Sequence, residues 1–417
     1  MTERRRQSRR GLLAAVAVTA TAGCLRSNVG QSSEARSAGT ATRTGDTDTD
    51  DRTGDTDGVT SGWPAFGADR TGRGTADVTP PGTPLAAEWS VALDAEAGDP
   101  AVSDGTVYVV GRTSITALDA ATGSEEWVYD VGLANGGPAP TVVGDTVYAT
   151  PGDGYAYALS TEGEFQWSEQ LTAGNGTSRI GPRPVADTVV VADQRQIAGL
   201  AADTGEREWA RTVPGNGITG IVTDGKRVYV GSFTSTIDEP TVLALDGASG
   251  ETVWRQDGQF NGAHAPAVVD GTVYAGGFRK GTPLFALDAE TGDTMWTQTV
   301  SAEIHTSPAV GESTVYVSDL RGTLHAVERE TGTRRWQTDL REETVETDPV
   351  NSSAPALVDG QVYLGTQSGQ MVVIDTEDGS VLSSVTVGET VLASPAVADG
   401  RVIVGSTDGT LSAYVTN

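Results

Sequence analysis

Residues 286–296 read ALDAETGDTMW, and close variants of this stretch recur along the chain. Leu287 ends an apolar run of the kind that forms a strand. Asp288 can accept hydrogen bonds from turn amides, and Gly292 can take a positive φ without a Cβ clash. Trp296 falls on the segment that returns from the turn. The stretch therefore predicts a tight β-hairpin with a tryptophan on its second strand.

The hairpin recurs at a nearly constant spacing. Two copies are degenerate, since the copy at 159–167 is one residue shorter and the copy at 374–379 has Ser383 where a tryptophan is expected. The steps between successive tryptophans from Trp127 to Trp336 are 40, 42, 45, 42 and 40 residues. A fixed period in this range indicates one supersecondary unit that is stacked repeatedly.

Each unit has a second half upstream of the turn. Residues 265–277, APAVVDGTVYAGG, show a Pro-Ala-Val segment, a tight turn and an alternating strand. Asp-Gly pairs at 104–105, 270–271 and 399–400 are strong hairpin signals, so their aspartates are interpreted as turn residues. No segment has helical periodicity. Four short antiparallel strands in about 40 residues are typical of the blade of a β-propeller.

The number of units predicts the architecture. Eight unit starts can be counted, at Asp99, Gly137, Gly181, Ile218, Ala265, Ser307, Ala354 and Ser394. The last unit reaches Asn417 without a tryptophan strand, whereas residues 84–93, PLAAEWSVAL, form a tryptophan strand with no blade before it. Pairing the two would close a ring and remove two exposed sheet edges. We predict an all-β, eight-bladed propeller closed by this N-terminal strand; a seven-bladed ring is the alternative if the unit at 181–209 is miscounted.

The repeat resembles the PQQ-like β-propeller family over residues 84–417, and residues 63–74, WPAFGADRTGRG, resemble the lead-in that precedes such propellers. The resemblance implies that the turn tryptophans dock between neighbouring blades. A buried tryptophan contributes about 150–250 Å² of contact, which suits a wedge-shaped gap between sheets. We therefore expect a structural role for Trp89, Trp127, Trp167, Trp209, Trp254, Trp296 and Trp336.

The chain is strongly acidic, with a net charge of −28 and only two lysines, Lys226 and Lys280. The excess lies in the propeller, because residues 1–62 hold 9 basic and 8 acidic groups whereas residues 63–417 hold 19 and 48. Such a surface repels nucleic acid and anionic lipid headgroups. It resembles proteins adapted to high salt, where screening removes self-repulsion. An acidic surface for cationic partners is the competing explanation, but the acidity is spread over every repeat.

The N-terminal residues resemble an export signal. Residues 1–23 have a basic start, an apolar stretch and small residues before Cys24, the only cysteine in the chain. Residues 8–13, SRRGLL, resemble a twin-arginine motif, and residues 21–24, TAGC, resemble a lipobox. We expect a lipid on Cys24, a disordered Ser/Thr/Asp/Gly stalk over residues 24–62 and a monomeric propeller over residues 63–417, exported to the outer face of the cytoplasmic membrane.

The family resemblance extends to quinoprotein dehydrogenases, whose propellers hold pyrroloquinoline quinone and Ca²⁺ above the central channel. Many of those enzymes place a Cys-Cys disulfide against the quinone, and this chain has no such pair. We assign no catalytic, cofactor-binding or metal-binding residue from the sequence. His264 and His305 precede adjacent units and should lie side by side near the channel, although a third metal ligand is not evident and solvated loop histidines are the favoured interpretation. His325 lies in a middle strand and is expected to be packed or edge-exposed. The residues of the candidate binding rim are His264, Arg279, Lys280, His305, Asp319, Arg321 and Asn351.

Two function classes follow from these observations. The first is a non-catalytic, lipid-anchored surface scaffold that binds a protein or an envelope polymer and needs no cofactor. The nearest analogy is the propeller lipoprotein of the outer-membrane barrel-assembly machinery, whose specific role needs an outer membrane and is not carried over. The second class is a sugar or alcohol dehydrogenase that depends on pyrroloquinoline quinone with Ca²⁺. The sequence favours the scaffold, because it has no Cys-Cys pair and no set of quinone and Ca²⁺ ligands that can be placed, and fold alone does not imply function.

Overall fold

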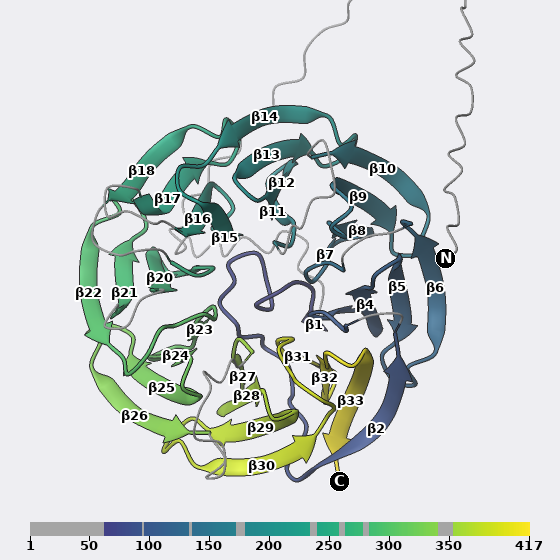
Figure 1. Ribbon diagram of the computed structural model, residues 1–417, viewed down its shortest axis with the longest axis vertical. Coiled ribbons are helices and arrows are strands. Elements are labelled where there is room, and N and C mark those ends of the chain that lie inside the picture. Colours follow the sequence, from purple (N-terminus) through teal and green to yellow (C-terminus); the bar gives the residue numbers. More distant parts are fainter. Residues whose placement is uncertain are drawn as a thin grey trace, which may run out of the picture. The chain divides into compact units, whose positions relative to one another are not determined.

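A computed structural model describes residues 62–93, 96–132, 136–171, 180–233, 240–257, 263–277, 283–340 and 353–417 (Figure 1). All regular structure in these residues is β-strand. No helix in these ranges has the length and apolar character needed to cross a membrane. Several predictions concern residues outside the described ranges: the signal at 1–23, Cys24, the stalk up to residue 61, Arg279, Lys280 and Asn351.

The strands form eight antiparallel sheets arranged as blades in a ring (Figure 1). Blade 1 contains β3 (Ala101–Ser103), β4 (Thr106–Val110), β5 (Ser114–Asp119) and β6 (Glu125–Asp130), and blade 2 contains β7 (Thr141–Val143), β8 (Thr146–Ala149), β9 (Tyr155–Ser160) and β10 (Phe165–Gln170). Blade 3 contains β11 (Arg183–Val185), β12 (Thr188–Asp193), β13 (Gln196–Ala201) and β14 (Arg207–Thr212). Blade 4 contains β15 (Gly217–Thr223), β16 (Arg227–Phe233), β17 (Pro240–Asp246) and β18 (Thr252–Asp257).

Blade 5 contains β19 (Ala267–Val269), β20 (Thr272–Gly276), β21 (Pro283–Asp288) and β22 (Thr294–Thr299), and blade 6 contains β23 (Ala309–Val310), β24 (Thr314–Ser318), β25 (Thr323–Glu328) and β26 (Arg334–Asp339). Blade 7 contains β27 (Ala356–Val358), β28 (Gln361–Gly365), β29 (Gln370–Asp375) and β30 (Val381–Thr386). Blade 8 contains β31 (Ala396–Ala398), β32 (Arg401–Gly405), β33 (Thr410–Thr416) and β2 (Leu85–Ala92). The strand β1 (Gly62–Trp63) adds to the inner edge of blade 1.

The ring closes through β2, as predicted. This strand pairs antiparallel with β33, and Leu85 lies opposite Thr416, Trp89 opposite Ala413 and Ala92 opposite Thr410. Blade 8 is therefore built from both ends of the propeller sequence, and β33 is hydrogen-bonded on both sides, to β2 and to β32. The eight-bladed prediction is confirmed and the seven-bladed alternative is wrong, because residues 181–209 form a complete four-stranded blade.

The repeated Gly and Trp contact each other across successive blades. The Nε1 of Trp254 in blade 4 donates a hydrogen bond of 2.9 Å to the carbonyl of Ala289 in the turn of blade 5. A Cβ added to Gly292 of that turn would lie 2.6 Å from the Trp254 ring, and its φ is +78°. The motif thus requires glycine twice over, for its conformation and for its contact. Equivalent Nε1 bonds of 2.8–3.0 Å start from Trp89, Trp127, Trp167, Trp209, Trp296 and Trp336.

The missing tryptophan of blade 7 has a structural reason. Ser383 occupies its position, and the next blade offers no hairpin turn between β33 and β2, because these strands come from distant parts of the chain. Other contacts hold this interface. Tyr414 in blade 8 donates a hydrogen bond of 3.1 Å to the Thr386 carbonyl of blade 7. The repeat therefore loses its tryptophan where the following turn is absent.

Residues 63–82, which we call the lead-in, cross the centre of the ring (Figure 1). Trp63 pairs with Val102 of blade 1. Carbonyls further along the lead-in then accept hydrogen bonds from successive blades. From blade 2 to blade 8, the donors in the blades are Val142, Arg183, Thr223, Val268, Val310, Leu357 and Gly400. Their acceptors in the lead-in are, in the same order, the carbonyls of Pro64, Phe66, Arg70, Thr71, Arg73, Gly74 and Thr79. The lead-in satisfies polar groups that the inner strands would otherwise leave unpaired.

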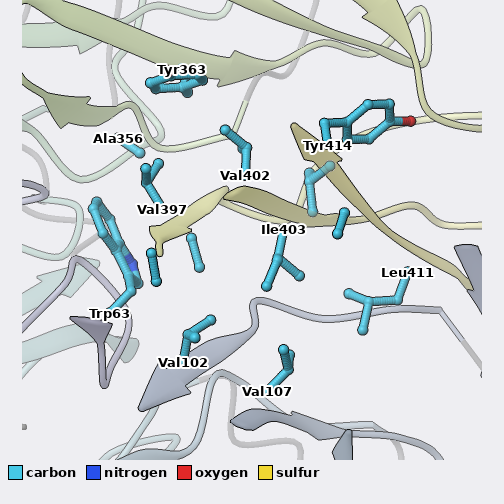
Figure 2. Packing of buried hydrophobic residues seen from close by; sticks show 14 of the residues in the cluster. Trp63, Val102, Val107, Ala356, Tyr363, Val397, Val402, Ile403, Leu411 and Tyr414 are labelled. Carbon is cyan, nitrogen blue, oxygen red and sulfur yellow. The ribbon is translucent and has the colours of Figure 1, made fainter. Parts of the chain in front are cut away.

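Hydrophobic packing joins the lead-in to the closing blade (Figure 2). Trp63 is only 2% exposed and belongs to one cluster with Val102 of blade 1, Tyr363 of blade 7 and Val397 of blade 8. Burial of such side chains stabilises a fold by about 1.5–3 kcal/mol each. The junction between the ends of the propeller is therefore held by packing as well as by strand pairing.

The two ends of the ring differ. The first turn of each blade and the third turn of blades 1 to 7 lie at one end, which we call the turn end. The Asp-Gly turns there have φ values of +49°, +47° and +50° at Asp104, Asp270 and Asp399, which confirms them as turn residues. The middle turns and the connections between blades lie at the opposite end, which we call the loop end, because the inner strands begin there. The candidate rim residues were expected at one rim, and the described ones belong to these loop-end connections.

Candidate binding site at the loop end of the channel

The ring encloses a cavity on its axis at the loop end. Its volume is about 190 Å³. Every blade contributes at least one lining residue close to the start of its inner strand, and Phe66 of the lead-in also lines the cavity. The polar lining side chains are Asp99, Arg183, Thr219, His264, His305, Thr306, Ser307 and Ser394. The cavity thus combines one cation, one carboxylate and several hydroxyl and imidazole groups with an apolar remainder.

Arg183 on β11 is the buried cation of the cavity, with an exposed fraction of 2%. Its Nε donates to the Ile221 carbonyl at 3.0 Å, and its Nη2 donates to the Phe66 carbonyl at 3.0 Å. The guanidinium lies 5.9 Å from the centre of the Phe66 ring. Burial lowers the pKa of Arg183 to about 10, although Asp69 and Asp99 oppose the shift. Its Nη1 is buried and has no hydrogen-bond partner among the described residues.

The sequence analysis did not select Arg183, although the repeat contains a signal for it. Arg183 pairs with Val190 of β12. At the equivalent position, the inner strands of the other blades carry a small or apolar residue. The equivalent positions are Ala101, Thr141, Val222, Ala267, Ala309, Ala356 and Ala396. A charged residue at a position that the repeat reserves for small side chains indicates a role particular to that blade.

Asp99 was counted as the start of a unit and not as a functional residue. It lies in the connection before β3, and its Oδ1 accepts a short hydrogen bond from the Ser394 amide of blade 8. Burial raises the pKa of Asp99 to about 6, and Glu96 adds to the rise, whereas the hydrogen bonds of Ser394 and the charge of Arg183 oppose it. This carboxyl group therefore changes its charge near neutral pH, inside the cavity.

His264 and His305 line the same cavity, as their place in adjacent units suggested. Burial lowers the pKa of His264 to about 4, and the nearby His305 contributes to the shift. The His305 Nε2 donates a hydrogen bond of 3.1 Å to Glu303. His264 is therefore neutral at physiological pH and adds no positive charge to the cavity.

Asp319 and His325 form a buried pair that the sequence analysis did not foresee. His325 is fully buried on β25, and its Nε2 lies 2.9 Å from the Asp319 Oδ2. Asp319 also accepts hydrogen bonds from the Ser301 hydroxyl and from the amides of Arg321 and Thr323. Burial alone would raise the pKa of Asp319, but the hydrogen bonds from His325 and Ser301 outweigh it and lower that pKa.

The Asp319–His325 pair fixes the turn between β24 and β25, next to a second cavity of about 240 Å³ that shares His264, His305 and Thr306 with the axial cavity. Asp319 is thus a buried turn anchor at the edge of the site. Arg321, in the same turn, is exposed at the loop end. Of the candidate rim residues in the described ranges, only His264 and His305 line the axial cavity.

The described residues do not fit a bound quinone with Ca²⁺. Calcium takes 6–8 oxygen ligands, often carboxylates. Asp99 is the one carboxylate among the described residues that line the axial cavity, and its raised pKa disfavours the ionised form. No three His, Cys, Asp or Glu side chains come together as a possible metal site within the ranges that the structure describes. The axial cavity is also smaller than the ~300 Å³ at the lower end of ordinary ligand pockets.

The ring of eight four-stranded blades, crossed by the lead-in, defines a β-propeller with an axial cavity. The family model "Outer membrane protein assembly factor BamB" matches residues 85–239, 238–387 and 320–417, and the chain belongs to this family. A curated relative, BamB of Alkalilimnicola ehrlichii, is 32% identical over 149 residues, which are 33% of this chain and 37% of that protein. The alignment thus spans little more than a third of the relative.

Solved structures show the same fold. BamB from Moraxella catarrhalis superimposes with a TM-score of 0.65 at 20% identity and covers 80% of this chain and 98% of that one. The quinohemoprotein alcohol dehydrogenase from Comamonas testosteroni superimposes with a TM-score of 0.68 at 16% identity and covers 86% of this chain and 81% of that one. At these identities the likeness concerns the fold and does not decide between a scaffold and an enzyme.

Proposed function

We propose that this chain is an exported, lipid-anchored β-propeller that acts as a non-catalytic binding scaffold in the cell envelope. The observation that carries the proposal is the match of the BamB family model, which extends along nearly the whole ring. The curated relatives in this family are named assembly factors. The outer-membrane role in that name belongs to the relatives. For this chain the proposal is the coarser one, a propeller that binds a protein or envelope-polymer partner as a monomer and without a cofactor.

The loop end is the surface proposed for the partner. The turn end consists of short turns, many of which are used to pack against tryptophans, and the lead-in occupies the inner strand ends. At the loop end, Arg321 of blade 6 and Gln367 of blade 7 are exposed in the middle turns of their blades. Surfaces formed by connecting segments on a rigid scaffold commonly carry binding functions.

The export and anchoring parts of the proposal rest on the sequence. Twin-arginine-like residues 8–13 and the lipobox-like residues 21–24 precede Cys24, the only cysteine. The excess of acidic residues over the propeller agrees with a protein that works in high salt at the cell surface. The proposed location is the outer face of the cytoplasmic membrane.

Site-specific photo-crosslinking in intact cells tests the scaffold function. A photoreactive residue is placed at Arg321 or Gln367 of the loop end, and at the exposed Ala121 or Glu290 of the turn end as matched controls. We expect one recurrent crosslinked partner from the loop-end positions and none from the turn-end positions. Equal labelling at both ends, or no adduct at the loop end, would contradict the proposed docking surface.

A quinone titration tests the alternative function. Purified protein in molar salt receives pyrroloquinoline quinone and Ca²⁺, and absorption spectra are recorded together with dye reduction by sugars and alcohols. We expect neither saturable quinone binding nor turnover. Stoichiometric binding with turnover would replace the scaffold by the dehydrogenase.

A further inference from the structure

We propose that the axial cavity is a binding site for a small monocarboxylate, held between Arg183 and Ser307. The two residues belong to blades 3 and 6 and line the same cavity. Each carries a buried polar atom without a hydrogen-bond partner among the described residues, Nη1 of Arg183 and Oγ of Ser307. This binding site is independent of the proposed docking of a partner on the loop end.

The orphaned atoms define the chemistry of the ligand. An unsatisfied buried polar atom costs about 1–3 kcal/mol, and a buried cation costs more, so both groups favour an acceptor in the cavity. Nε and Nη2 of Arg183 each donate to a carbonyl, whereas Nη1 has no partner among the described residues and can donate to a ligand. The hydroxyl of Ser307 can supply a second donor. Two donors that line one small cavity suit the two oxygens of a carboxylate.

The rest of the cavity selects against larger and more highly charged anions. Its volume of about 190 Å³ has room for roughly six atoms of the size of a water molecule. Phe66, Ile180 and Ile221 supply apolar walls for a short hydrocarbon part. The carboxyl of Asp99 also lines the cavity, so the two negative charges of a dianion such as phosphate would be repelled by the ionised carboxylate. A short-chain monocarboxylate satisfies all three conditions: it is small, it has a short hydrocarbon part and it carries a single negative charge.

Binding of the monocarboxylate should depend on pH through Asp99. The charged and titratable groups that act on Asp99 are Glu96 and Arg183, and His264 and His305 line the same cavity. The pKa of Asp99 is raised to about 6, so its carboxyl is mostly protonated at pH 5 and mostly ionised at pH 7.5. If the ligand binds only beside the protonated acid, its apparent Kd rises roughly 30-fold between these two pH values.

Calorimetric titration of the full-length chain with propionate tests the site, at one fixed molar salt concentration. Propionamide, which has the same shape without the charge, is the control ligand. We expect saturable 1:1 binding of propionate, no binding of propionamide and loss of binding in Arg183→Met. Because Arg183 also holds the lead-in, Ser307→Ala provides a second variant that leaves those bonds intact, and it should weaken binding by roughly tenfold.

Further titrations test the role of Asp99 and the source of the bound carboxylate. Asp99→Asn should bind the propionate anion with equal affinity at pH 5 and pH 7.5, when the ligand concentration is corrected for the neutral propionic acid present at pH 5. Tri-alanine with a free or an amidated carboxyl terminus distinguishes the source of the carboxylate: tighter binding of the free peptide points to the chain terminus of a partner, and binding of propionate alone points to a free acid. Absence of saturable binding, equal binding of propionamide, or a folded Ser307→Ala protein with unchanged affinity would overturn the proposal.

Discussion

The packing of each turn glycine on the preceding tryptophan can be tested by comparing two glycines. Gly292 and Gly271 have similar φ values of +78° and +73°. A Cβ at Gly292 would lie 2.6 Å from the Trp254 ring, whereas a Cβ at Gly271 would have no atom within 4 Å. The substitution to alanine therefore imposes the same backbone strain at both sites, but an atomic overlap only at Gly292.

The expected loss of stability follows from these two contributions. A left-handed conformation costs an L-residue about 1–2 kcal/mol. Overpacking against a buried ring adds about 1–3 kcal/mol. The gain from a less flexible unfolded chain applies to both variants and cancels in their difference. We expect Gly271→Ala to lower the free energy of unfolding by about 1 kcal/mol, and Gly292→Ala to lower it by about 1–3 kcal/mol more.

The assay is denaturant unfolding followed by tryptophan fluorescence in fixed molar salt. A double-mutant cycle with Trp254→Ala isolates the contact, because the penalty of Gly292→Ala should fall to that of Gly271→Ala once the ring is removed. Equal losses for the two glycine variants in the parent protein would refute the reasoning. A penalty at Gly292 that persists without the Trp254 ring would refute it as well.

Three further predictions concern closure, anchoring and pH. Deleting residues 84–93 removes β2, so the protein should aggregate or lose cooperative unfolding, whereas deleting residues 25–62 should leave the melting transition nearly unchanged; a parent-like melt of the first variant would mean that β2 is dispensable. Cys24→Ser should release the protein from membranes or leave it unprocessed, and membrane retention of a correctly cleaved variant would exclude the lipid anchor. The lowered pKa of Asp319 stabilises the fold above the unfolded pKa of about 3.9, and this contribution is lost as the pH falls through the folded value; Asp319→Asn should therefore be less stable than the parent at pH 7, with a difference that shrinks below pH 4 in urea titrations.

The fold could be predicted because its determinants are local and repeated. Each unit carries its own turn residues and alternating strands, so eight copies indicate the same blade eight times. The closing strand was predictable for a related reason: residues 84–93 have the pattern of an outer strand but no unit before them. Blade 3 was the weakest unit in the sequence, and its four strands nevertheless pair in sequence order from β11 to β14.

The candidate site could be predicted only in part, because its residues meet through the curvature of the ring. His264 and His305 start adjacent units, so their proximity followed from the repeat. The pairing of Arg183 with the Phe66 carbonyl joins positions 117 residues apart, and no local pattern encodes it. Asp319 was assigned to the candidate binding rim as a polar residue of a predicted loop. Its side chain is instead buried, and it accepts hydrogen bonds from His325 and Ser301 of neighbouring segments.

The order of hydrogen bonds along the lead-in has a consequence for how this protein can evolve. Repeat proteins commonly gain or lose whole units, because each unit contacts only its neighbours. Here, contacts from Trp63 to Thr79 reach the eight blades in the order in which the blades follow along the chain. A duplicated ninth blade would find no residue of the lead-in opposite its inner strand, and every later contact would be displaced by one position. The number of blades is therefore inherited together with the lead-in, a segment outside the repeats. A lineage that gains or loses a blade must also change the length or sequence of its lead-in.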